Sequence, residues 1–83
     1  MNIYVGNLSY RLKEQQLQEV FEEFGEVESA KIIMDKMAGR SKGFGFVEMP
    51  NEDEALTAIE RLNDQLLDGR NIVVKKALNK EDS

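Results

Sequence analysis

The chain has 83 residues and contains no cysteine and no histidine. Without cysteine it can form neither disulfides nor thiolate metal sites, and its composition fits a reducing compartment. Without histidine it lacks the commonest general base and the commonest metal ligand. The acidic pair Glu22 and Glu23 is no substitute, because adjacent residues on a helix point about 100° apart. We therefore expect no enzymatic activity, no metal and no cofactor.

Long apolar runs are missing as well. No stretch approaches the ~18–20 apolar residues that span a membrane, so we expect no membrane partner. The first expected strand begins almost at residue 1, and we expect no signal or transit peptide before it. The length corresponds to a single domain. We assign residues 1–78 to that domain and residues 79–83 to a short polar tail.

The net charge of −5 argues against binding to nucleic acid, unless the acidic side chains are segregated from the basic ones. Residues 9–29 hold two basic and six acidic side chains, and residues 50–69 hold one and six. Residues 30–49 and 70–83 each hold four basic and two acidic side chains. The acidic charge thus belongs to the segments expected to be helical and the basic charge to those expected to be strands. A phosphate-binding surface on the strands remains compatible with this balance.

Two stretches repeat apolar residues at the i, i+3, i+4 and i+7 spacing of a helix with one buried face. In residues 13–24 these are Leu17, Val20, Phe21 and Phe24. In residues 51–62 they are Ala55, Ala58, Ile59 and Leu62. Asn51 is a good N-cap for the second helix, and Glu54 completes a pattern close to a capping box.

Four stretches alternate apolar and polar residues, as half-buried strands do: residues 2–8, 27–34, 42–49 and 71–75. The order strand–helix–strand–strand–helix–strand predicts a two-layer α+β sandwich of the ferredoxin-like type, βαββαβ.

Several side chains between or within these elements have expected places. In the second strand, Ala30, Ile32 and Met34 should share the core face. Tyr10 could touch a ligand, but we expect it to pack in its loop beneath the first helix. Leu66 and Leu67 should cover the edge of the core.

Residues 42–49 (KGFGFVEM) have an unusual pattern for a strand. One face carries two aromatic and two charged side chains: Lys42, Phe44, Phe46 and Glu48. The other face carries two glycines and two apolar residues: Gly43, Gly45, Val47 and Met49. The glycines would let another element, such as a helix, pack close to the backbone. The aromatics, about 7 Å apart along the strand, form a platform on which nucleic-acid bases can stack.

This octet resembles the RNP1 motif of the RNA-recognition motif (RRM) family, K/R-G-F/Y-G/A-F-V-x-F/Y. It differs only at Met49, a core-facing position that methionine can fill. Residues 3–8 (IYVGNL) are similar to the family's second motif, RNP2. The resemblance covers residues 2–77, and the chain is similar to the small single-RRM proteins of bacteria. It implies a four-stranded antiparallel sheet with strand order 4-1-3-2 and two helices on one face.

The resemblance also implies a function, the binding of single-stranded RNA, with single-stranded DNA as a second candidate. Tyr4 and Phe46 would stack on bases, Phe44 would pack on the sugar between them, and Lys42 would meet a phosphate. Further contacts at the margins would come from Lys31, Arg40, Asn71 and Lys75. We expect a cytoplasmic monomer.

Two other functions are compatible with the same fold. A protein-interaction module could bind a basic partner through its acidic helical face. Such modules often lose the stacking aromatics, however, and this chain keeps all three. A small enzyme would need a nucleophile, a base or an oxyanion site, and the sequence shows no such set of residues.

Overall fold

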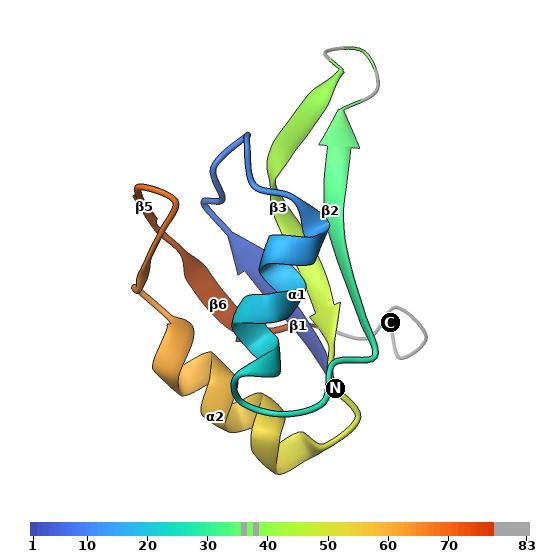
Figure 1. Ribbon diagram of the computed structural model, residues 1–83, viewed down its shortest axis with the longest axis vertical. Helices are drawn as coiled ribbons and strands as arrows, with labels where there is room; N and C mark the ends of the chain where they lie inside the picture. The colour runs from blue at the N-terminus through green and yellow to red at the C-terminus, as the bar shows by residue number, and fades with distance from the viewer. Residues whose placement is uncertain (36, 38, 78–83) are drawn as a thin grey trace.

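The computed structural model describes residues 1–35, 37 and 39–77, with the backbone alone for residues 40–42. The expected tail at residues 79–83 lies outside the described residues. Two helices and six strands follow one another along the chain (Figure 1). They are β1 (Asn2–Gly6), α1 (Glu14–Glu22), β2 (Ser29–Asp35), β3 (Arg40–Glu48), α2 (Glu52–Leu62), β4 (Leu66–Leu67), β5 (Arg70–Asn71) and β6 (Val73–Lys76).

Four of the strands form one antiparallel sheet in the order β2-β3-β1-β6. Since β6 is the fourth long strand of the chain, this is the predicted order 4-1-3-2, and the ferredoxin-like fold is confirmed. In the central strand β1, Tyr4 lies opposite Phe46 of β3 on one side and opposite Lys75 of β6 on the other. The short strands β4 and β5 pair only with each other and form a separate hairpin that the sequence analysis did not predict.

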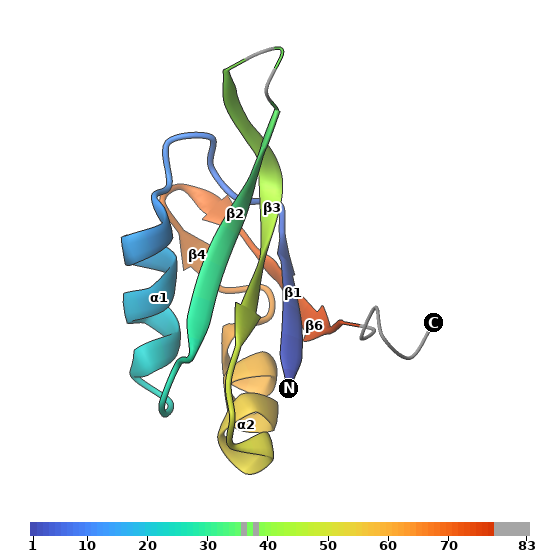
Figure 2. The same ribbon diagram turned by 90° about the vertical axis from the view of Figure 1, so that its right-hand side faces the viewer.

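The helices and the sheet form two layers around one core. Figure 2 shows the sheet nearly edge-on, with α1 on one side and no helix on the opposite side. The core consists of the apolar side chains of the sheet face toward the helices and of the inner helix faces, among them Ile3, Val5, Leu17, Phe21, Val47, Met49, Ala55, Ala58, Ile72 and Val74. Neither helix, within the described part of the chain, has the length and apolar character needed to cross a membrane.

The helix starts follow from local hydrogen bonds. The Oδ1 atom of Asn51 accepts the backbone N–H of Glu54 at 3.0 Å, which satisfies one of the free donors at the start of α2. At the start of α1 the cap is Lys13, whose ammonium cannot accept a hydrogen bond. There the side-chain oxygen of Gln16 accepts the Lys13 N–H at 2.9 Å instead.

Two apolar side chains do not lie where the sequence pattern placed them. Met34, expected in the core, is 54% exposed next to the C-terminal end of β2, past the point where the pairing of β2 with β3 shifts register. Between the pairs Ile32–Gly45 and Met34–Ser41, β3 carries two residues more than β2, as in a β-bulge. Met34 stays on the side of Ile32 and Leu12 but is not covered by the core. Leu66, expected to cover the core edge, is 69% exposed in the β4–β5 hairpin, while Leu67 packs against the core.

Gly45 allows close packing, although of a different element from the one expected. A Cβ atom at this position would overlap the carbonyl oxygen of Lys31 and lie 3.1 Å from the Cα atom of Ile32. The close neighbour is therefore strand β2 at its irregular pairing, and the expectation of a helix there was wrong. A glycine at this position lets β2 and β3 approach where their regular ladder is interrupted.

Candidate nucleic-acid interface

Three aromatic rings gather on the face of the sheet that carries no helix. Tyr4 comes from β1, and Phe44 and Phe46 come from β3. Their ring centroids lie 5.9 to 6.1 Å from one another. We call these three residues the aromatic platform. The two motifs, about forty residues apart in the sequence, meet because β1 and β3 are neighbours in the sheet.

The rings of the aromatic platform differ in orientation. Tyr4 and Phe44 are nearly parallel, with 28° between their planes, whereas Phe46 stands at 68° to Tyr4 and 88° to Phe44. Phe46 is 36% exposed, and the other two rings are half-buried against their neighbours. Cross-strand packing explains part of this arrangement. Even so, all three rings lie together on the solvent side of the sheet, where flat ligands can stack on them.

Lysines flank the aromatic platform on both sides. On β6, Lys75 lies opposite Tyr4, and its Nζ atom is 5.3 Å from the centre of the Tyr4 ring. On β2, the exposed Lys31 lies opposite Phe46. The side chains of Arg40 and Lys42 lie outside the described residues, although their backbone belongs to β3. The described cations are thus placed to meet the phosphates of a strand lying across the sheet.

Asn71 does not occupy the position that the sequence predicted. It belongs to β5 and pairs with Leu66 of the hairpin, outside the four-stranded sheet. Its side-chain amide donates to the carbonyl oxygen of Asp64 at 2.9 Å, and its own carbonyl accepts from Asn7. The assignment of Asn71 to the fourth strand was wrong, because the chain leaves the β4–β5 hairpin at Ile72 before it joins the sheet.

Two side chains that the sequence analysis did not place at the site lie beside the aromatic platform. Tyr10 is 55% exposed, lies near Gly43 of β3 and also borders the residues at the start of α1. Arg70 reaches the same place from β5. With Tyr4, Asn7, Leu8 and Phe44 they line a hollow of about 230 Å³. No local pattern could have found this hollow, because its walls come from three distant parts of the chain.

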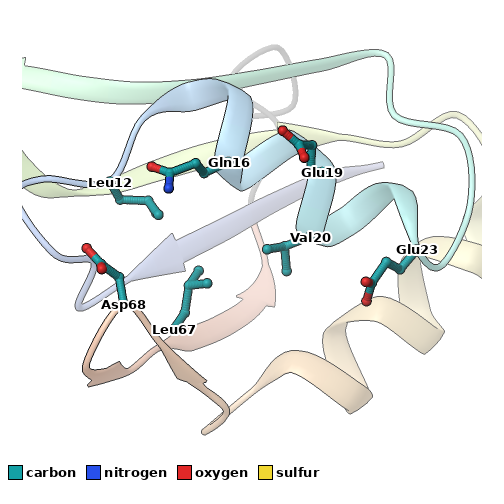
Figure 3. Close-up of a pocket in the computed structure, with 7 residues that line it drawn as sticks. All are labelled: Leu12, Gln16, Glu19, Val20, Glu23, Leu67 and Asp68. Atoms are coloured by element: carbon teal, nitrogen blue, oxygen red, sulfur yellow. The ribbon is translucent and has the colours of Figure 1, made fainter.

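The other side of the molecule carries an acidic groove of about 370 Å³ between α1 and the β4–β5 hairpin. In Figure 3, Leu12, Val20 and Leu67 point into the space between these elements. The carboxylates of Glu19, Glu23 and Asp68 lie around its rim (Figure 3). This groove is the surface that a basic protein partner would use. Across the described residues, no cluster of three or more acidic side chains is arranged to hold a metal ion.

Comparison with known protein families places the chain. The family model of the RNA recognition motif matches residues 3–73. The chain belongs to the RNA recognition motif family. Its two motifs, its sheet order and its aromatic platform all correspond to that family, which consists in general of binding domains and not of enzymes.

Relatives of this RRM chain are named as RNA-binding proteins. A probable glycine-rich RNA-binding protein of Arabidopsis thaliana is 51% identical over 72 residues, which are 87% of this chain and 48% of the plant protein. A protein of Nostoc sp. named as an RNA-binding protein, RbpB, is 46% identical over 82 residues, 99% of this chain and 80% of its own length. This RRM chain therefore spans about half of the plant relative and most of the cyanobacterial one.

The structure resembles solved RRM structures as well. A crystal structure of an RNA-binding protein, PG1, superposes with a TM-score of 0.92 and 52% sequence identity, and the match covers 96% of each chain.

Proposed function

We propose that this domain binds single-stranded RNA by stacking bases on its aromatic platform. The observation that carries the proposal is the meeting of Tyr4, Phe44 and Phe46 on the helix-free face of an RRM sheet. Tyr4 and Phe46 each offer a ring to one base, and Phe44, whose ring centroid is 6.0 Å and 6.1 Å from theirs, packs on the sugar between the two bases. A stacked base contributes about 1–3 kcal/mol and is accepted whatever its identity.

The flanking lysines position the strand by binding phosphates. Lys75 and Lys31 lie on opposite sides of the aromatic platform, so a strand that crosses the rings passes both of them. We include Lys42 and Arg40 in this role because they precede the platform residues on β3. Phosphate contacts carry no sequence information. The net charge of −5 opposes binding, so the affinity should depend on stacking more than on charge.

The acidic groove suggests binding of a basic protein as a competing function. The family and the named relatives do not favour it, since they point to RNA. We further propose that the domain has no enzymatic activity and acts as a cytoplasmic monomer, as the resemblance to small bacterial RRM proteins implies. Light scattering of the purified protein and cell fractionation would test the last two points.

The experiment that tests RNA binding compares the parent protein with two double variants. Tyr4→Ala/Phe46→Ala removes two rings of the aromatic platform, and Glu19→Gln/Glu23→Gln alters the acidic groove by the same number of side chains. Binding of a fluorescent random single-stranded RNA pool, and of the corresponding DNA, is measured by anisotropy. We expect the first variant to lose RNA binding while its circular dichroism spectrum stays that of the parent, and the second to keep it. If the platform variant binds as well as the parent, RNA does not bind there.

A further inference from the structure

The hollow of about 230 Å³ lies where β1 ends, next to the aromatic platform. Its walls come from the segment after β1, with Asn7, Leu8 and Tyr10, from Gly43 and Phe44 of β3, and from Arg70 of β5. Figure 1 shows the loop after β1 and the β4–β5 hairpin side by side at that end of the sheet. Tyr4 lines the hollow too, so its ring borders both the platform and this space.

Arg70 is held in place at the hollow before any ligand arrives. Its Nη2 atom donates to Oδ1 of Asn7 at 2.8 Å. Asn7 in turn donates from Nδ2 to the carbonyl oxygen of Asn71 at 2.7 Å, so both ends of its amide are used. The backbone of Asn7 has a φ of 56°, a left-handed conformation that asparagine tolerates better than most residues. Asn7 therefore couples the end of β1 to β5 and orients the guanidinium.

The oriented guanidinium keeps donors for a ligand. A guanidinium has five N–H donors in a planar fork, and the contacts of the described residues occupy one of them. Because this hydrogen bond to Asn7 already restrains the exposed Arg70 side chain, less side-chain entropy is lost when a planar ligand binds. Arg70 is also the single charged residue that lines the hollow within the described structure.

The size and lining of the hollow favour a flat ring over a phosphate. Three of its lining residues, Tyr4, Tyr10 and Phe44, are aromatic. Pockets for small molecules hold about 300–1,000 Å³, so this smaller space suits a fragment such as one base. RNA bases that are splayed out of a strand are commonly stacked on aromatic side chains and read along their edges.

We propose that this hollow takes a guanine base next to the bases on the aromatic platform, and that Arg70 donates to its O6 and N7 atoms. The inference rests on the proposed RNA binding and adds a base preference to it. Arginine pairs its fork with the two acceptors of guanine, whereas adenine and cytosine present amino donors on that edge. Among the described lining residues no carboxylate is present to receive such an amino group. Asn7 acts as the positioning residue for Arg70.

The test uses a short oligouridine and the same oligomer with one uridine replaced by guanosine, 7-deazaguanosine, adenosine or cytidine. Uridines occupy the platform in every case, so the single replaced base can slide into the hollow. We expect guanosine to raise affinity by about 5- to 100-fold over the other bases, the range of one bidentate pair. 7-Deazaguanosine, which lacks the N7 acceptor, should lose most of that gain.

Three variants separate base reading from phosphate binding. Arg70→Lys keeps the charge and loses the planar fork, Arg70→Gln loses both, and Asn7→Ala frees the guanidinium. All three should reduce the guanosine preference and leave the affinity for plain oligouridine within about twofold, with melting temperatures measured to confirm folding. If instead Arg70→Gln weakens every oligomer equally and lowers the salt slope by about 0.7, Arg70 binds a phosphate and the proposal is overturned.

The outcome also separates this inference from the function on which it rests. If the parent protein binds all oligomers equally and Tyr4→Ala/Phe46→Ala abolishes that binding, the platform function stands and the guanine site is wrong. If the parent binds no oligomer at all, RNA binding is wrong and the guanine site fails with it. A guanosine preference that Arg70→Lys does not change would likewise overturn the role of Arg70.

Discussion

The ring of Tyr4 lies over Gly6, two residues further along the same face of β1. A Cβ atom at Gly6 would be 2.6 Å from the Oη atom of Tyr4 and 2.8 Å from one of its ring carbons. Gly6 therefore provides the space in which the Tyr4 ring rests near Phe44. The Tyr4 ring can take its place in the aromatic platform because Gly6 has no side chain.

We predict that Gly6→Ala weakens RNA binding without unfolding the domain. The added methyl group must push the Tyr4 ring aside, which costs part of the ~1–3 kcal/mol of one base stack. The fold should survive because the obstacle is the end of a side chain and not backbone. The measurement is a double-mutant cycle by anisotropy: on a Tyr4→Ala background, Gly6→Ala should have no further effect. An undiminished effect on that background would show that Gly6 acts on something other than Tyr4.

Single truncations on the two faces of the domain should have opposite consequences. Phe46→Ala should weaken RNA binding by about 1–3 kcal/mol and leave stability nearly unchanged, since its ring is on the solvent side. Phe21→Ala should cost about 3–5 kcal/mol of unfolding free energy, because its ring is fully buried in the core. Urea titrations and RNA titrations of both variants would check this. Unfolding of Phe46→Ala would contradict its assignment to the surface.

The dependence of RNA affinity on salt concentration should show how many phosphates the flanking lysines neutralise. On single strands the slope of log affinity against log salt is about −0.7 for each phosphate neutralised. With Lys31, Lys42 and Lys75 engaged, we expect a slope of roughly −2. Lys75→Gln should reduce its magnitude by about 0.7 and weaken unrelated sequences by one common factor. A salt series with several oligomers measures both quantities, and a loss confined to one sequence would mean that Lys75 reads a base.

Gly45→Ala should destabilise the sheet. Its Cβ atom would overlap the Lys31 carbonyl oxygen, and backbone of a paired strand cannot move aside as a side chain can. Overpacking of this kind costs about 1–3 kcal/mol, which a shift of the urea midpoint would reveal. Gly6→Ala is the matched control, because it adds the same methyl group next to a movable ring. Equal stability of the two variants would show that β2 and β3 do not approach closely at Gly45.

Neutralising the acidic groove should leave RNA recognition intact. Glu19 lies on α1 and Glu23 caps its C-terminal end, in the layer away from the aromatic platform. Charges separated by more than about 8 Å are largely screened at physiological salt. Glu19→Gln/Glu23→Gln should therefore change RNA affinity by less than about twofold at that salt, as measured by anisotropy, with any gain growing at low salt. A large loss of affinity would show that RNA also contacts the helical side.

The sequence by itself determined the architecture and the aromatic platform. Strand alternation and helical spacing are local periodicities, and burial of one face requires them. The positions of Phe44 and Phe46 on one strand face follow from the same period. The pairing of Tyr4 with Phe46 follows from the resemblance of the two motifs to a family with a known strand order.

Only the tertiary structure decided the irregular features. The pairing of β2 with β3 shifts by two residues after Ile32, and Met34, beyond the shift, is exposed. The alternation of residues within β2 gives no sign of such an irregularity in its partner strand. The β4–β5 hairpin removes Asn71 from the sheet for a similar reason, since a two-residue strand is too short to show a period. The hollow depends on Asn7 and Arg70, 63 residues apart. This hydrogen bond can form only after the sheet and the hairpin have brought the two residues together. The sequence around either residue therefore does not predict that it contacts the other.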